Sequence, residues 1–144
     1  MLGLNIALGF FMILELLNVI ILYWFPESDK GNGVAAFKSL EKAKEIPEVY
    51  RLIKYLVNWV AGTKIIFIAL LFVIMIYGNE TIKHVATGAL VLSISTFYWR
   101  LYPMIKEMDA LGEIQPKGYY KTLASTIAIF ITGLLVAMAI QALI

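Results

Sequence analysis

Two charged residues, Glu15 and Lys64, lie in long apolar stretches of the sequence. A charged side chain costs about 2.5–3.5 kcal/mol at the middle of a bilayer, so such residues mark paired or functional sites. On a helix, Glu15 lies about 15 Å from the end of its stretch at Phe25. Lys64 lies roughly 14 Å from the start of its own stretch at Tyr55. The matching depths predict an ion pair, which either belongs to an ion pathway or only neutralises two charges and fixes the helix register.

Further polar residues extend from this pair toward one end of the predicted helices. Asn18 shares a helix face with Glu15, because residues three apart are neighbours on a helix. Two other polar stripes have three- and four-residue spacing. They are Arg51, Lys54, Asn58 and Gly62 on the second helix, and Ser93, Thr96 and Arg100 on the third.

The stripes predict a polar cavity that is open to the cytoplasm and closed toward the outside. Two guanidinium groups favour a carboxylate or phosphate, so we expect Arg51, Asn58 and Arg100 to bind an anion, a lipid headgroup or a small acidic metabolite. Alternatively, Arg100 extends to lipid phosphate, and Asn18 and Asn58 form hydrogen bonds between helices. The candidate ligand-binding or ion-pathway residues are therefore Glu15, Asn18, Arg51, Asn58, Lys64 and Arg100.

The composition indicates which elements must hold these residues. The 144 residues are 61% hydrophobic and 15% charged, with a mean hydropathy of +0.83, whereas soluble domains have about 45–50% apolar and 25% charged residues. We expect an all-α integral membrane protein with one transmembrane domain, 1–144, whose four transmembrane helices form an antiparallel bundle. The expected spans are 4–25, 55–77, 81–103 and 119–144.

Helix-breaking residues set the ends of these helices. Pro47 suits the first turn of the second helix, which we expect to stop at Gly78 and Asn79. The third helix is expected to extend beyond its span to Leu111 and to stop at Gly112.

The first long loop contains an amphipathic segment. Val34, Phe37 and Leu40 recur at helical spacing among lysines. The segment is either a short interfacial helix on the membrane surface or a solvated loop helix.

The basic residues predict the orientation of the helices. Six lie in or near the first long loop and three in or near the third, whereas the short second loop has only Lys83. The positive-inside rule therefore places loops 26–54 and 104–118 in the cytoplasm and both termini outside, in a cell inner or plasma membrane.

Composition also excludes several kinds of site. No cysteine is present, which excludes iron–sulfur clusters and thiolate catalysis. The one histidine, His84, cannot supply both axial ligands of a haem, and it is expected to be an interfacial residue or a pH sensor. A calcium site is not expected, because the ligand positions around Gly33 fall to Ser28, Lys30 and Ser39. The net charge of +2 argues against nucleic acid as a partner.

The sequence favours a non-enzymatic function. Only Glu15 and Lys64 have the depth of a buried acid–base pair, and they would neutralise each other. Four helices enclose little volume, so a pathway favours self-association, and the spacing of Gly133 and Ala137 suits close helix packing. We expect a self-associated transport or channel unit, or a subunit of a membrane complex. Its partners would be the lipid bilayer and copies of itself or another membrane subunit.

The second helix also carries a resemblance to a known family. Glu48, Arg51, Lys54 and Asn58 make this helix basic and asparagine-containing. In this helix and its topology, the chain resembles the small four-helix membrane enzymes of eicosanoid and glutathione metabolism. The compact Glu-Arg and Asn-x-x-Glu groups of that family are absent here. The resemblance implies an alternative function, a membrane-embedded enzyme that joins glutathione to a lipophilic substrate or isomerises such a substrate.

Overall fold

The computed structural model describes residues 2–30 and 33–143, and these residues are almost entirely helical. Within them, an isolated antiparallel bridge between Phe37 and Ile114 is the sole β-type pairing. The elements are α1 (Leu2–Trp24), η1 (Val34–Ala36), α2 (Ser39–Lys44), α3 (Pro47–Tyr77), α4 (Glu80–Ala110) and α5 (Tyr119–Leu143).

The ends of α3 and the start of α4 agree with the sequence prediction. Pro47 occupies the first turn of α3, where its missing N–H leaves no hydrogen bond unmade. At the other end, the Gly78 N–H donates to the Ile74 carbonyl at 2.8 Å. A Cβ atom at Gly78 would lie 2.4 Å from that oxygen, so the turn requires glycine. The side chain of Asn79 then caps α4 by accepting from the Ile82 N–H at 2.9 Å.

The end of α4 is also close to the predicted one. The helix continues through Pro103 to Ala110. Gly112 follows with φ +75°, a conformation that favours glycine. The predicted extension beyond the third span is therefore confirmed as helix.

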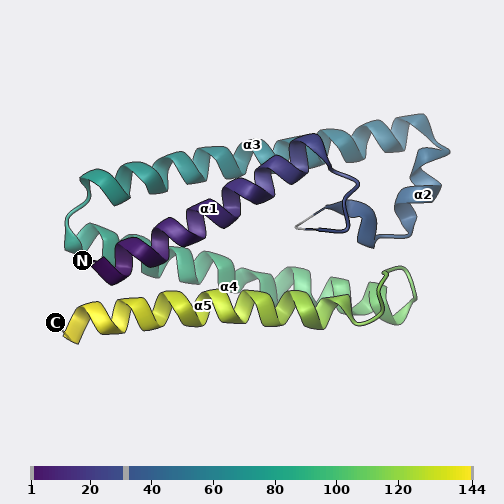
Figure 1. The fold of residues 1–144 in the computed structure, drawn as a ribbon. Coiled ribbons are helices and arrows are strands. Elements are labelled where there is room, and N and C mark those ends of the chain that lie inside the picture. Colours follow the sequence, from purple (N-terminus) through teal and green to yellow (C-terminus); the bar gives the residue numbers. More distant parts are fainter. Residues whose placement is uncertain (1, 31–32, 144) are drawn as a thin grey trace.

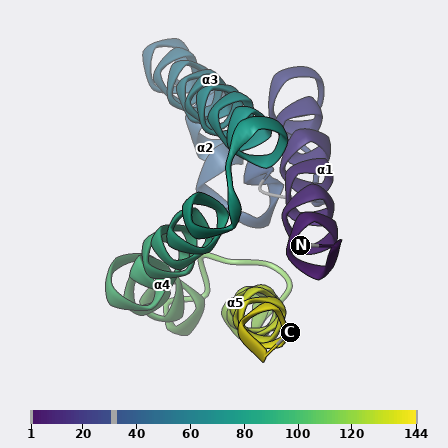
Figure 2. The same ribbon diagram turned by 90° about the vertical axis from the view of Figure 1, so that its left-hand side faces the viewer.

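The four long helices share a common axis, and each is antiparallel to the long helix before it in the sequence (Figure 1). Both termini lie at one end of the bundle, and the two long loops lie at the other (Figure 1). α1 packs against α3 and α5, and α4 packs against α5. α3 and α4 are joined by the short turn at Gly78 and Asn79 but lie apart for most of their length (Figure 2).

The core is divided along the bundle. Toward the termini, Phe11 of α1 is buried against the rings of Phe67 and Phe130, with edge-to-face geometry and centroid distances of 6.0 and 5.9 Å. Toward the loops, Phe97, Ile105 and Ile114 form a second buried cluster that packs against α5, and a third joins α1 to α3. The candidate cavity described below lies beside the first of these clusters.

The two long loops are tied together. The Lys38 N–H donates to the Glu113 carbonyl, and the Gln115 N–H donates to the Ala36 carbonyl, both at 2.9 Å. These bonds flank the bridge between Phe37 and Ile114. The predicted placement of both loops at one end of the bundle is confirmed.

The amphipathic segment of the first loop is helical only in part. It forms η1 and the six-residue α2, and Leu40 and Ala43 are buried, with 4% and 5% of their surface exposed. The apolar residues of α2 are thus covered by protein, since α2 packs against α3. The exposed charged residues Glu41, Lys42 and Lys44 fit the alternative of a solvated loop helix.

Among the described residues, α1, α3 and α5 are long and apolar enough to cross a membrane. The predicted spans 4–25, 55–77 and 119–144 coincide with these three helices, except that residue 25 follows α1 and residue 144 is outside the described residues. The predicted span 81–103 lies in α4, which is long enough but more polar. At about 1.5 Å per residue, the 31-residue helices α3 and α4 are each about 46 Å long and exceed a hydrocarbon core of about 30 Å.

Candidate functional site: an ion pair beside a cavity

The ion pair predicted from matching depths is present. The Lys64 ammonium group of α3 donates to Oε2 of Glu15 on α1. The Lys64 side chain is 20% exposed and the Glu15 side chain is 24% exposed, so neither charge is sealed in the core. Because α1 and α3 are long apolar helices, the pair places two opposite charges where each lowers the desolvation cost of the other.

The side chains of Glu15 and Lys64 line an open cavity. This cavity has a volume of about 480 Å³, within the range of roughly 300–1,000 Å³ that is usual for ligand sites. Its walls come from α1, α3 and α4, on the side of the bundle where α3 and α4 lie apart. The lining residues are Phe11 and Glu15 of α1, Trp59, Val60, Thr63, Lys64 and Phe67 of α3, and Leu90, Ser93 and Ile94 of α4.

The cavity wall has four polar side chains among six apolar ones. The Thr63 hydroxyl donates to the Trp59 carbonyl at 2.9 Å, and the Ser93 hydroxyl donates to the Ala89 carbonyl at 2.8 Å. Both hydroxyl protons are therefore used within a helix, but the oxygens keep acceptor capacity. The wall thus offers one ammonium group, one carboxylate and two hydroxyl oxygens within an otherwise apolar surface.

The other candidates lie outside this lining. Asn18 is partly buried on α1 and has an interacting partner of its own, whereas Asn58 is exposed on α3. Arg51 is exposed, with one nitrogen 3.7 Å from the carboxylate of Glu48 in the same helix. Arg100 is exposed and lies over the ring of Trp99, 4.8 Å from its centroid. The structure brings Glu15 and Lys64 together, but these contacts of the two arginines stay within their own helices.

A second polar group near the chain termini was missed from the sequence. Lys83, expected in a short outer loop, lies in the first turns of α4 with 5% of its surface exposed. Its ammonium group donates to the side-chain oxygen of Asn5 in α1 at 3.0 Å. The ring of His84 lies 3.1 Å from the Met138 carbonyl of α5. The sequence signal was weak, because a lysine and a histidine beside a predicted turn ordinarily face water.

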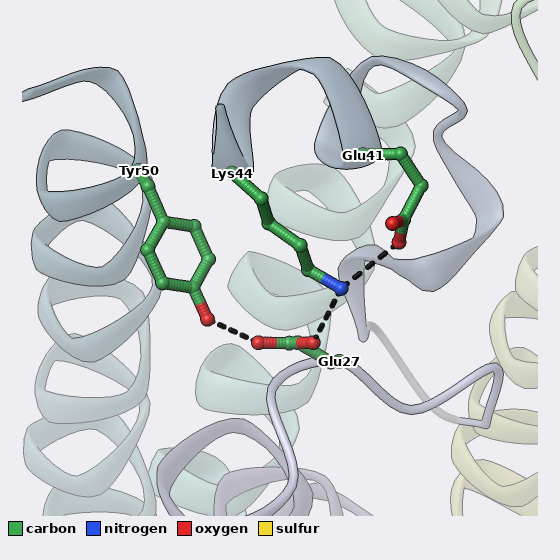
Figure 3. Close-up of polar contacts among 4 residues, drawn as sticks. All are labelled: Glu27, Glu41, Lys44 and Tyr50. Carbon is green, nitrogen blue, oxygen red and sulfur yellow. Dashed lines mark hydrogen bonds and ion pairs between the residues drawn. The ribbon is translucent and has the colours of Figure 1, made fainter. Parts of the chain in front are cut away.

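A third polar cluster joins the end of α1 to α2 and α3 (Figure 3). The Tyr50 hydroxyl donates to one Glu27 oxygen, and Lys44 binds the other Glu27 oxygen and Glu41, both at 2.9 Å. The Tyr50 hydroxyl, and then Lys44, lower the pKa of the Glu27 carboxyl below its ordinary value of 4.5. Hydrogen bonds to Glu41 and Glu27 raise the pKa of Lys44. These hydrogen bonds and ion pairs hold the first long loop against α3. We call the cluster of Glu27, Glu41, Lys44 and Tyr50 the loop clamp.

The donor set does not favour a metal centre. In residues 2–30 and 33–143, no three Asp, Glu or His side chains are grouped so as to hold a metal ion. The pair of Glu15 and Lys64 supplies one carboxylate and a cation that would compete with any metal for it.

Known proteins give no further guidance to this site. The chain matched no model of a protein family, no curated protein and no solved structure.

Proposed function

We propose that this chain is a small polytopic membrane protein that works as a self-associated transport unit, with its ligand cavity centred on Glu15 and Lys64. The observation that carries the proposal is that an ion pair between two long apolar helices borders an open cavity of about 480 Å³. A pair that served only to fix the helix register needs no cavity beside it. Here both charged side chains border a cavity of ligand size.

The proposal includes α4 as the fourth membrane-spanning helix. Ser93 lines the cavity, so one of the polar residues that lower the hydropathy of α4 borders the proposed ligand site. The loop ends of α3 and α4 would extend into the cytoplasm with loops 26–54 and 104–118, and both termini would lie outside. A second copy beside the separated α3 and α4 would complete a wall that one chain leaves open.

Two other functions remain as alternatives. A subunit of a membrane complex would use the same open side for a different chain. A glutathione-dependent enzyme would need the basic residues of α3 to face a substrate, and exposed Arg51 and Asn58 lie outside the lining of the cavity. No contact in the structure favours the enzyme over transport.

Accessibility of the cavity from both sides of the membrane tests the transport proposal. The chain contains no cysteine, so Thr63→Cys and Ser93→Cys each introduce a single thiol into the wall. In proteoliposomes, we expect a membrane-impermeant thiol reagent to label each variant when it is applied to either side. A transport cycle exposes its site alternately to the two sides, which produces this pattern.

A matched control separates water access from simple exposure. Ile13 is 60% exposed and lies close to the depth of Glu15, but it lines a different, wholly apolar groove between α1 and α3. We expect Ile13→Cys to stay unlabelled from both sides because lipid fills that groove. Labelling of Thr63→Cys and Ser93→Cys from one side only, or from neither side, would overturn the proposed transport function.

A further inference from the structure

The charges of the cavity define the class of ligand that fits it. Resting on the proposed function, we propose that the cavity binds a zwitterionic amphiphile whose ammonium and anionic groups lie only a few bonds apart. The ligand ammonium group pairs with Glu15, its carboxylate or phosphate pairs with Lys64, and its apolar part lies against Phe11, Trp59 and Phe67.

The first argument is charge balance. Glu15 and Lys64 are the charged residues in the wall, and they carry opposite charges in contact with each other. A ligand with a single charge would add an uncompensated net charge to an apolar surrounding. A ligand with both charges leaves no charge uncompensated.

The second argument is the free bonding capacity of the pair. Lys64 has three N–H donors, and its contact with Oε2 of Glu15 uses one. The carboxylate likewise keeps lone pairs on its second oxygen. A ligand can therefore bind without breaking the pair, by placing its two charges beside the two partners in reversed order. Since the partners touch each other, the ligand charges must also be close together.

The third argument is the shape of the apolar wall. Phe11 and Phe67 lie edge to face at 6.0 Å, and Leu90 of the same wall belongs to the buried core around Phe11. These residues form a firm apolar surface next to the charges. Trp59 lines the cavity and is 63% exposed, with its ring 6.4 Å from that of Tyr55, so it offers aromatic surface to an apolar chain or an aromatic ring.

The apolar groove between α1 and α3 shows what a site without this selectivity looks like. Its volume of about 450 Å³ is similar, and its wall consists only of apolar residues, among them Met12, Leu16 and Phe72. That groove accepts an apolar chain but has no partner for a headgroup. The charged pair is thus the feature that makes the larger cavity selective.

Binding of matched probes tests the ligand class. The full chain in detergent, with Trp24→Phe and Trp99→Phe so that Trp59 is the remaining tryptophan, reports binding through its fluorescence. L-phenylalanine has both charges, phenylalaninamide only the cation and N-acetylphenylalanine only the anion. We expect L-phenylalanine to bind about tenfold or more tightly than either singly charged probe, because each analogue leaves one polar partner unpaired.

A parallel arm tests a lipid as the source of the same chemistry. Short-chain phosphatidylethanolamine has both charges, and phosphatidylglycerol with equal chains has only the anion. Preference for phosphatidylethanolamine without binding of L-phenylalanine identifies a lipid headgroup, and the reverse identifies a free zwitterion. Either result supports the proposal, whereas equal or tighter binding of the singly charged probes in both arms overturns it.

Two double variants separate ligand selectivity from folding. Glu15→Gln/Lys64→Met removes both charges, and we expect the preference for the zwitterion to disappear. Glu15→Lys/Lys64→Glu keeps one charge of each sign, and we expect it to retain the preference. Loss of preference in the exchanged variant, with a folded protein, would contradict the pairing model. Labelling of Thr63→Cys from both sides without any zwitterion preference would leave the transport function standing and refute this inference alone.

Discussion

The carboxylate of Glu15 and the ammonium group of Lys64 meet at the interface of α1 and α3, although 49 positions separate them in the sequence. Each residue alone would make its helix costly to insert into lipid. Together they tie the N-terminal helix to the second long helix near the middle of both. Their contact therefore links the stability of the bundle to the chemistry of its cavity.

This contact predicts a coupled effect on stability. We expect Glu15→Gln and Lys64→Met each to destabilise the protein by about 1–3 kcal/mol, because each leaves a partly buried charge without its partner. The double variant should recover much of this loss. Thermal unfolding in detergent of the four proteins of the cycle measures the coupling. Additive losses would show that the two residues contribute independently.

Helix ends and the ion pair were predictable because their signals are local or depend on length. Pro47 and Gly78 act through their own backbone chemistry, and the depths of Glu15 and Lys64 follow from the rise of a helix. These features need no knowledge of how the helices pack.

The features that the sequence did not predict depend on helix rotation and on contacts between distant segments. Periodicity shows that Arg51 and Asn58 share a face of α3, but it does not show that this face is exposed. The contributions of Thr63 and Trp59 to the cavity follow from where α4 lies. The bridge between Phe37 and Ile114 joins two loops that have no common sequence pattern.

The pairing of the two long loops predicts that a single substitution outside the apolar helices lowers the stability of the protein strongly. Ile114 is 3% exposed and packs with Phe97 and Ile105. We expect Ile114→Ala to lower the free energy of unfolding by about 2–4 kcal/mol, through lost burial and a residual cavity. The nearby Leu111 is 68% exposed, and Leu111→Ala should change stability by less than about 0.5 kcal/mol. Equal effects of the two substitutions would show that the buried cluster of Phe97, Ile105 and Ile114 does not stabilise the fold.

The loop clamp predicts a dependence of stability on pH. The pKa of Glu27 is lowered in the folded protein, so its stabilising effect is present above its ordinary value of 4.5 and is lost as the pH falls through the folded pKa. Because the Glu27 side chain is 40% exposed, we expect less than about 1 kcal/mol.

Unfolding at neutral pH and at about pH 3 measures this effect. Glu27→Gln should be less stable than the native sequence at neutral pH and nearly equal to it in acid. Glu48→Gln serves as the control, because the Glu48 carboxylate makes only a 3.7 Å contact with exposed Arg51. A stability deficit of Glu27→Gln that persists unchanged in acid would exclude a contribution of the Glu27 charge.

The orientation proposed for the chain predicts which residues are accessible in intact cells. Lys42→Cys and Lys117→Cys should resist an impermeant thiol reagent until the cells are opened, because the positive-inside rule places both loops in the cytoplasm. Tyr77→Cys, at a position 83% exposed beside the short turn, should react in intact cells. Lys83 is a poor reporter because it is buried. The reverse labelling pattern would invert the topology.

The last prediction concerns the buried lysine near the chain termini. Lysines at helix ends usually extend their ammonium group to water, but Lys83 is 5% exposed and donates to the neutral side-chain oxygen of Asn5. Asn5→Leu removes that acceptor and leaves a buried donor unsatisfied, so we expect a loss of about 1–3 kcal/mol.

Asn5→Leu/Lys83→Met should restore or exceed the native stability, because replacing both polar partners by apolar groups of similar shape removes the desolvation cost altogether. The hydrogen bond from the Thr87 hydroxyl to the Lys83 carbonyl does not involve either side chain and remains in every variant. Thermal unfolding of the two single variants and the double variant measures this asymmetry. If Asn5→Leu alone is harmless, the ammonium group reaches water by another route and the contact with Asn5 contributes nothing to the fold.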